Sequence, residues 1–398
     1  MRPAEGAGIA PVSADPNVSD PTTIAARGPA RRRVPGPTLA QVFDTRINAL
    51  NVWRLVLASG VILQHSWPLT GRKVHPPYDQ LFTQVWVDGF FAISGFLIAA
   101  SWVRNPRLRE YVAARALRIL PGLWVCLVVI AFVIAPIGVA IQGGSAAKLL
   151  MSRAPIEYVL HNAVLHVFFA GIDGTPRHVP FPGVWDGVLW TLIFEIFCYI
   201  AIAVAGVAGL LKRRWPAVVV FILLVVFSAL VAYPVEVQTV FQMIGRFALV
   251  FAAGTLLHQF QDKIPARWSL VALSAVIVLA AGLLMPNYRV LAAIPLAYAV
   301  VVSGALIHHE RLRLRTDLSY GVYIYAWPMQ QLLAICGLSF LPPVVFAVVA
   351  VVVTLPLAAL SWFLVEKRAL SLKSRIKRRA RGWGAVVSSG SRISTPGS

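Results

Sequence analysis

Few charged or imidazole side chains interrupt the long apolar stretches of this sequence, and those few are the residues able to do chemistry there. Arg54 and His65 share the first apolar stretch, eleven residues apart. At about 100° per residue, a helix returns both to nearly the same face, about 16 Å apart along its axis. A lone buried histidine is often only a hydrogen-bonded structural group. The face shared with an arginine favours a place on the wall of a polar cavity.

Two carboxylates are placed to serve that histidine. Asp88 lies near the start of the second apolar stretch and Glu195 lies in the fourth, both toward the side of the predicted bundle that holds His65. A carboxylate bound to one imidazole nitrogen leaves the other free to act as a general base. We therefore predict that the three side chains meet. The alternative is structural ion pairing of the same groups with Arg54 or Arg246.

A basic stretch over residues 104–118 contains Arg115 and Arg118, which share a helix face at a spacing of three. Guanidinium groups bind phosphate by two parallel hydrogen bonds, so this pair suits a phosphate-bearing ligand. The stretch fits equally well as a purely topological anchor on the inner side of a membrane. The residues alone thus predict phosphate-binding arginines at one end of a bundle and a histidine base toward the other, an arrangement that suits a group-transfer enzyme or a transporter.

Composition excludes an ordinary soluble domain. The 398 residues are 58% hydrophobic and 13% charged, whereas soluble domains carry about 25% charged residues. The net charge of +20 comes from Lys and Arg in short loops and in the tails, with no folded basic domain, so we predict no nucleic-acid partner. The three cysteines lie in apolar runs and show no metal-ligand or disulfide spacing. We expect neither a metal nor a bound cofactor.

The apolar stretches divide into ten segments of membrane-spanning length: 49–67, 85–103, 119–141, 188–211, 215–233, 240–258, 268–285, 290–307, 317–337 and 342–364. An even number puts both ends of the chain on one side. Of the 36 Lys and Arg residues, 28 then fall on that side and six on the other. The positive-inside rule makes that side cytoplasmic.

The predicted fold is therefore all-α, a polytopic membrane helix bundle of about ten transmembrane helices with both termini cytoplasmic. Residues 46–368 form the transmembrane domain. Residues 1–45 form a disordered cytoplasmic tail rich in Pro, Ala and Arg, and residues 369–398 form a basic cytoplasmic tail.

Six short polar elements follow one another in a fixed order: the pair Arg54 and His65, VDGFFAISGFLI over 87–98, RALRILP over 115–121, LWTLIFE over 189–195, SYGVYIYAWP over 319–328, and SWFLVE over 361–366. Together they resemble the membrane acyltransferases of the acyltransferase-3 family, the bacterial O-acetyltransferases of surface polysaccharides and glycolipids. Two positions depart from the family pattern. Val188 stands where Ser is usual, and Ala326-Trp327 replaces the commoner aromatic-His pair before Pro328, which weakens any inference about the substrate from relatives.

The resemblance implies transfer of an acyl group, most often acetyl, from cytoplasmic acyl-CoA to a hydroxyl of an extracytoplasmic carbohydrate or glycolipid, in the bacterial plasma membrane. It implies roles for six residues: Arg115 and Arg118 on the CoA phosphates, Arg54 on the thioester or pantetheine end, His65 as general base or transient acyl carrier, and Glu195 with Asp88 beside His65 or on sugar hydroxyls.

Two other functions compete with acyl transfer. A flippase or exporter of a glycolipid or polysaccharide precursor would use a similar polar path without acyl chemistry. An assembly protein of the cell envelope would need none of the intramembrane charges, so the coincidence of Arg54, His65 and Glu195 argues against it.

Overall fold

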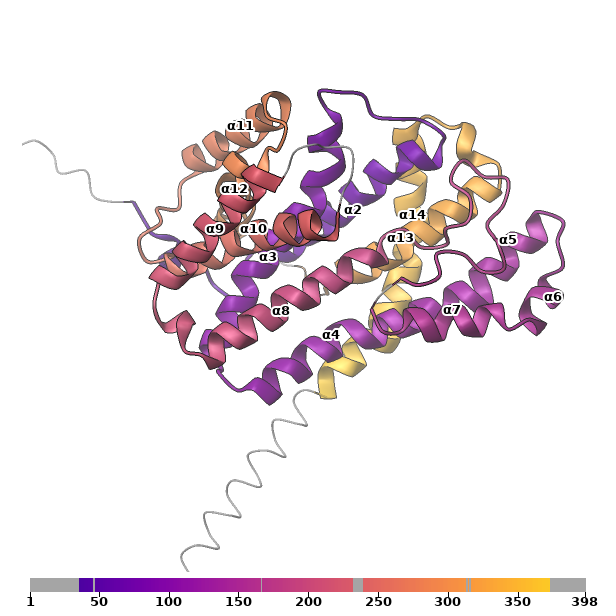
Figure 1. The fold of residues 1–398 in the computed structure, drawn as a ribbon, viewed down its shortest axis with the longest axis horizontal. Helices are drawn as coiled ribbons and strands as arrows, with labels where there is room; N and C mark the ends of the chain where they lie inside the picture. Colours follow the sequence, from indigo (N-terminus) through magenta and orange to yellow (C-terminus); the bar gives the residue numbers. More distant parts are fainter. Residues whose placement is uncertain are drawn as a thin grey trace, which may run out of the picture. The chain divides into compact units, whose positions relative to one another are not determined.

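The structure is a computed structural model that describes residues 36–45, 47–165, 167–231, 239–312, 314 and 316–372. These residues form helices and connecting loops without a β-strand (Figure 1). The helices are α1 (Leu39–Val42), α2 (Leu50–Leu69), α3 (Asp79–Arg104), α4 (Leu108–Val129), α5 (Ala135–Ile141), α6 (Ala146–Met151), α7 (Ala154–Asn162), α8 (Leu192–Val207), α9 (Trp215–Val231), α10 (Val240–Gln259), α11 (Trp268–Leu284), α12 (Arg289–Leu306), α13 (Ser319–Ile335) and α14 (Pro343–Ser361).

All ten predicted segments coincide with helices. Among the described residues, six continuous helical stretches are long and apolar enough to cross a membrane: Asp79–Arg104, Leu108–Ile141, Leu189–Val207, Val240–Gln259, Arg289–Leu306 and Pro343–Leu372. The second and last of these run through π-helical turns at Ile130–Ile134 and Trp362–Glu366. The all-helical, multi-pass architecture is thus confirmed, while the count of about ten crossings and the cytoplasmic termini stay predictions.

The basic stretch at residues 104–118, which precedes the predicted segment 119–141, is largely helical. Helix α4 begins at Leu108 and continues without a break through Arg115 and Arg118 into the apolar segment. Leu, Arg, Glu and Ala are strong helix formers, so the helix extends beyond the apolar run. Both arginines therefore have fixed positions on a long helix.

The predicted disordered tail is also shorter than expected. Within residues 36–45, α1 packs against the loop after α10, because the Leu39 amide donates to the carbonyl of Ile264 at 2.8 Å and the Leu39 side chain is fully buried. The prediction of disorder is wrong for this part. Residues 1–35 of the first tail and 373–398 of the second lie outside the described residues.

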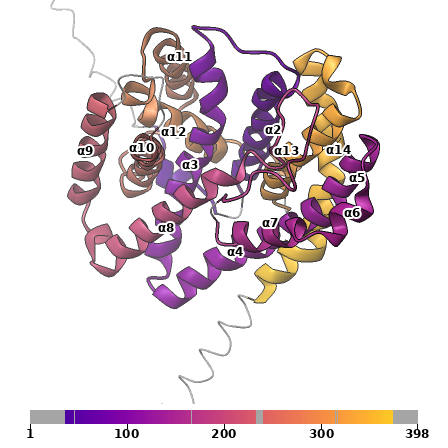
Figure 2. The same cartoon turned by 45° about the vertical axis from the view of Figure 1, so that its right-hand side comes forward.

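Helix α3 occupies the middle of the bundle, where it packs against α2, α8, α10 and α12 (Figures 1 and 2). Its closest neighbour is α10. A Cβ added at Gly95 would lie 2.0 Å from the carbonyl oxygen of Phe251, and one added at Gly254 would lie 2.0 Å from that of Ala92. Small residues allow such backbone contact between membrane helices, where packing replaces the hydrophobic effect.

Helix α2 lies between α3 on one side and α13 with α14 on the other. Helices α4 and α8 run beside each other across this group (Figures 1 and 2). The arrangement brings Arg54 of α2 toward the arginines of α4 and the carboxylate of α8.

We expect Gly254→Val to destabilise the bundle, because its side chain would need the space that the α3 backbone fills. Overpacking of this kind costs about 1–3 kcal/mol. The measurement is thermal unfolding of the purified protein in detergent. Ala201→Val, on an exposed face of α8, adds the same type of bulk and should leave the unfolding temperature nearly unchanged. Equal unfolding temperatures for both variants would contradict the proposed contact.

Candidate active site

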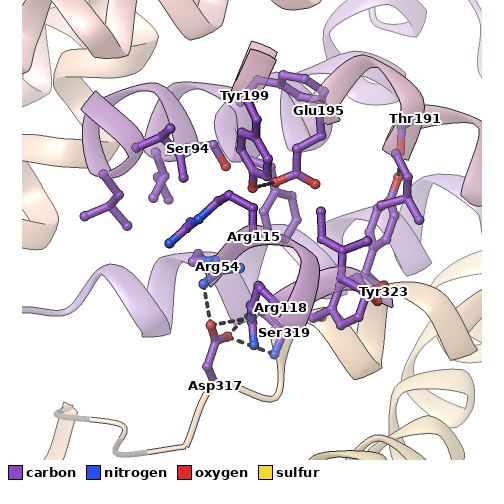
Figure 3. A pocket seen from close by; sticks show the side chains of 18 of the residues that line it. Arg54, Ser94, Arg115, Arg118, Thr191, Glu195, Tyr199, Asp317, Ser319 and Tyr323 are labelled. Carbon is purple, nitrogen blue, oxygen red and sulfur yellow. Dashed lines mark hydrogen bonds and ion pairs between the residues drawn. The ribbon is translucent and has the colours of Figure 1, made fainter. Parts of the chain in front are cut away.

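A cavity of about 320 Å³ lies among α2, α3, α4, α8 and α13 (Figure 3). Three guanidinium groups border it: Arg54 from α2, and Arg115 with Arg118 from α4. Its polar wall also includes Ser94 and Glu195, and its apolar wall comes mainly from α3. Cationic, hydroxyl and apolar groups therefore converge on one cavity, the usual composition of a small-molecule site.

Asp317 joins two of these arginines. Its carboxylate pairs with the guanidinium of Arg54 and, at 2.6 Å, with that of Arg118 (Figure 3). The Ser319 hydroxyl donates to the same carboxylate at 2.5 Å, and Arg118 also contacts Glu366 at 3.4 Å. Two guanidinium groups and one hydroxyl thus converge on the Asp317 carboxylate.

Arg115 differs from the other two arginines. Its guanidinium lies 5.7 Å from the centre of the Tyr199 ring, and its buried Nε has no hydrogen-bond partner among the described residues. The Tyr199 hydroxyl donates to Glu195, on the same side of the cavity (Figure 3). Arg115 thus carries a charge toward the cavity without an ion pair in the described part of the chain.

Part of the cavity wall is a hydroxyl pair from α13 and the turn before α8. Tyr323 and Thr191 share a hydrogen bond of 2.6 Å, and the Phe90 ring packs edge-on to Tyr323 with centroids 5.9 Å apart. All three side chains line the cavity. One turn further along α13, Trp327 packs edge-on to His65 at 4.8 Å between ring centroids. Helix α13 therefore extends from the arginine-lined cavity at Tyr323 to His65 at Trp327.

His65 lies on the same continuous helix as Arg54 but is not among the residues that line the cavity. Its Nε2 is 3.2 Å from the side-chain nitrogen of Gln64, and its buried Nδ1 has no hydrogen-bond partner in the described part of the chain. Neither Asp88 nor Glu195 contacts it. The predicted meeting of the histidine with two carboxylates does not occur.

Asp88 belongs to a separate buried cluster. Its carboxylate accepts from Arg246 at 3.1 Å and from Arg289 at 2.5 Å, and from the Tyr288 hydroxyl. For Asp88 the structure thus shows the ion pair with Arg246 that the alternative predicted, whereas neither His65 nor Glu195 pairs with Arg54 or Arg246 in the described residues. Arg289, one residue before the predicted segment 290–307, begins α12 and is buried. A second cavity, of about 370 Å³, borders these two arginines and Asp79.

Four of the six predicted residues thus line one cavity: Arg54, Arg115, Arg118 and Glu195. Their roles stay predictions. Sequence reasoning missed Asp317, Glu366 and Tyr199. The available signal was that Asp317 lies two residues before the SYGVYIYAWP element and that Glu366 ends the SWFLVE element. Nothing in the sequence marked Tyr199. Within the described residues, no group of three His, Cys, Asp or Glu side chains is placed to hold a metal ion.

Comparison with known proteins decides the family. The profile of the acyltransferase domain matches residues 47–363. The chain belongs to the acyltransferase-3 family. It is 28% identical over 353 residues to the O-acetyl transferase of Shigella phage Sf6, covering 82% of this chain and 97% of that protein. It is 27% identical over 365 residues to nodulation protein 10 of Rhizobium leguminosarum bv. viciae, covering 83% and 95%. No solved structure matches it.

The sequence region that matches the family contains the arginine-lined cavity. The match spans α2 to α14 and includes every residue that lines the arginine cavity except Leu370. The protein is a multi-pass membrane acyltransferase. Of the functions considered from the sequence, the family supports the enzyme rather than the transporter or the assembly protein.

Asp317→Asn tests the ion-pair centre of this acyltransferase. The substitution leaves Arg54 without its carboxylate partner and Arg118 with Glu366 alone. Since removing one partner of a buried ion pair costs about 3–5 kcal/mol, we expect the variant to be less stable than the wild type by about 3 kcal/mol. Thermal unfolding in detergent at pH 7 measures it. Asp262→Asn, which breaks the exposed pair with Arg214, is the control, and an equal loss there would contradict the assignment.

Proposed function

We propose that this enzyme transfers an acetyl group from cytoplasmic acetyl-CoA to a hydroxyl of an extracytoplasmic carbohydrate or glycolipid, in the bacterial plasma membrane. The observation that carries the proposal is one helix, α2, with Arg54 in an arginine-lined cavity and His65 eleven residues further along. A donor whose phosphates bind at one end and whose thioester reaches toward the other fits this spacing. The name of the phage relative, O-acetyl transferase, supports acetyl as the group transferred.

The arginine cavity is the proposed donor site. Arg115 is the principal phosphate ligand, because no carboxylate neutralises it in the described residues. Arg118 and Arg54 are held in place by Asp317 and present their remaining N–H groups. Arginine suits this role since its planar fork matches phosphate oxygens. Glu195, bonded to Tyr199, is assigned to the wall of the donor site.

His65 is the proposed group that activates the acceptor. As a general base it takes the proton of the acceptor hydroxyl while that oxygen attacks the thioester carbonyl. The carbon–sulfur bond breaks, and the proton passes to the CoA thiolate. As a nucleophile it would carry the acetyl group and then pass it to the acceptor. Both routes need the same residue in the same place. Asp88 is assigned to holding α3 against α10 and α12.

The first experiment compares wild type with His65→Ala in inverted membrane vesicles that receive radiolabelled acetyl-CoA on the cytoplasmic face. We expect label in a glycan or glycolipid fraction for the wild type and its loss by at least about 100-fold in the variant, the lower range of general-base catalysis. Immunodetection and gel filtration check that the variant is present and folded. Label that persists in folded His65→Ala would remove His65 from the mechanism.

A second variant, Arg115→Gln, addresses the donor site. Loss of a charge-assisted phosphate contact should raise the KM for acetyl-CoA roughly 10- to 100-fold, with little change in the KM for the acceptor. Arg109→Gln removes a charge from an exposed position of the same helix and should change neither constant. A rise in the acceptor KM alone would move Arg115 out of the donor site.

A further inference from the structure

The second cavity, of about 370 Å³, lies where the ends of four helices meet. Its wall comes from the first turns of α3, α10 and α12, from the last turns of α9, and from the turn before α12. Since α3, α10 and α12 are long enough to span a membrane, their ends lie near the lipid head groups. The two cavities share no lining residue, so this one is separate from the candidate active site.

Two guanidinium groups border the second cavity with part of their hydrogen-bonding capacity unused. The Nε atoms of Arg246 and Arg289 donate to the two oxygens of Asp88, and their Nη2 atoms donate to oxygens of Gln84. Neither Nη1 atom has a hydrogen-bond partner in the part of the chain that the structure describes. Two cations thus share one buried carboxylate and keep donors that suit the oxygens of a phosphate.

A carboxylate also borders this cavity. Asp79, the first residue of α3, is partly buried, and its side chain makes no hydrogen bond or ion pair within the described residues. It lies five residues before Gln84, about 7.5 Å along the helix axis. The formal charges of Arg246, Arg289, Asp88 and Asp79 therefore sum to zero, with the positive charge at the arginines and a negative charge at Asp79.

Part of the cavity wall is apolar. Phe227 and Val231 of α9 and Met243 of α10 contribute to it. Their sequence neighbours Leu230 and Phe241 are 75% and 72% exposed. Large exposed apolar side chains next to one another mark a surface that contacts lipid or another apolar partner. The polar groups of the cavity thus adjoin a surface that suits hydrocarbon chains.

The charges distinguish among three classes of ligand. A simple anion would use the arginine donors but would lie near the unpaired carboxylate of Asp79. A neutral polyol would leave the arginine pair without a second anion. A ligand that carries a phosphate and a nearby ammonium satisfies both ends. The buried hydroxyl of Ser228 also lines the cavity and lacks a partner among the described residues, so it offers one more polar contact.

We propose that the second cavity binds a phosphate with an ammonium group close to it, the head group of a lipid of the phosphatidylethanolamine type. The phosphate oxygens accept from Arg246 and Arg289, and the ammonium donates to Asp79. Basic pockets between membrane helices are established sites for lipid head groups. Soluble phosphoethanolamine has the same polar chemistry, but the adjoining apolar surface favours the lipid. The inference does not depend on the proposed acetyl transfer.

The test is native mass spectrometry of the purified full-length protein in detergent, titrated with three dioleoyl lipids: phosphatidylethanolamine, phosphatidylglycerol and phosphatidylcholine. Their acyl chains are identical. The glycerol head group has no cation, and the choline cation has no N–H donor. We expect phosphatidylethanolamine to bind with a Kd about 10-fold lower than the other two, the effect of one charge-assisted hydrogen bond.

Two variants separate the phosphate contact from the ammonium contact. Asp79→Asn should abolish the preference for phosphatidylethanolamine and leave the Kd of the other two lipids unchanged. Arg246→Lys keeps a positive charge beside Asp88 but loses the planar fork, so it should raise the Kd of all three lipids roughly 3- to 10-fold. Asp173→Asn removes an exposed carboxylate from the loop before α8. It is the matched control and should change none of these constants.

Soluble O-phosphoethanolamine, used as a competitor, distinguishes the two sources of the head group. If it fails to displace the lipid, the lipid itself is the ligand. If it displaces the lipid in the wild type but not in Asp79→Asn, the same contacts bind a soluble phosphate. Equal Kd values for the three lipids in the wild type would mean that they bind only as unspecific boundary lipid, and would overturn the inference. A preference that persists in folded Asp79→Asn would overturn it as well.

Discussion

A single carboxylate, Asp317, has to neutralise two guanidinium groups that arrive on different helices. In a low-dielectric environment an unpaired buried charge is costly, so Arg54 of α2 and Arg118 of α4 are both drawn to this residue. Arg118 extends the network to Glu366 beyond α14. These ion pairs thereby tie α2 and α4 to the chain segments before α13 and after α14 at the cavity wall. Because Asp317 lies two residues before Ser319, it also fixes where α13 begins, and with it the positions of Tyr323 and Trp327.

The two ends of the polar path differ in charge, and the difference matches the two proposed substrates. The arginine cavity carries cations whose pairing is incomplete, since Arg115 has no carboxylate partner in the described residues. The region around His65 instead contains neutral amides and an indole. A polyanionic donor and an uncharged polyol would each be attracted by the end that suits it. The hydroxyl pair of Thr191 and Tyr323 lies between them.

The sequence predicted the helices well and their mutual contacts less well. Apolar runs of membrane-spanning length must be helical in lipid, because backbone groups have no other partners there, and all ten segments are helices. A search for apolar runs does not find the start of α4, because residues 108–118 are basic and yet belong to the same helix as the apolar run that follows. Four of the residues predicted from the sequence line one cavity, as a common functional site requires: Arg54, Arg115, Arg118 and Glu195. The partner of Asp88 depended on how α3, α10 and α12 pack, which one-dimensional spacing does not specify.

The surroundings of His65 constrain how it can work. The sequence predicted a carboxylate on one imidazole nitrogen of His65, and such a partner also stabilises the imidazolium that forms when the ring takes a proton. Its observed neighbours are Gln64 and Trp327, neither of which carries a charge. A proton taken from the acceptor is therefore poorly stabilised on the ring and has to move on to the departing thiolate as the thioester opens. Neutral neighbours therefore favour one continuous proton transfer over a stable charged intermediate at His65.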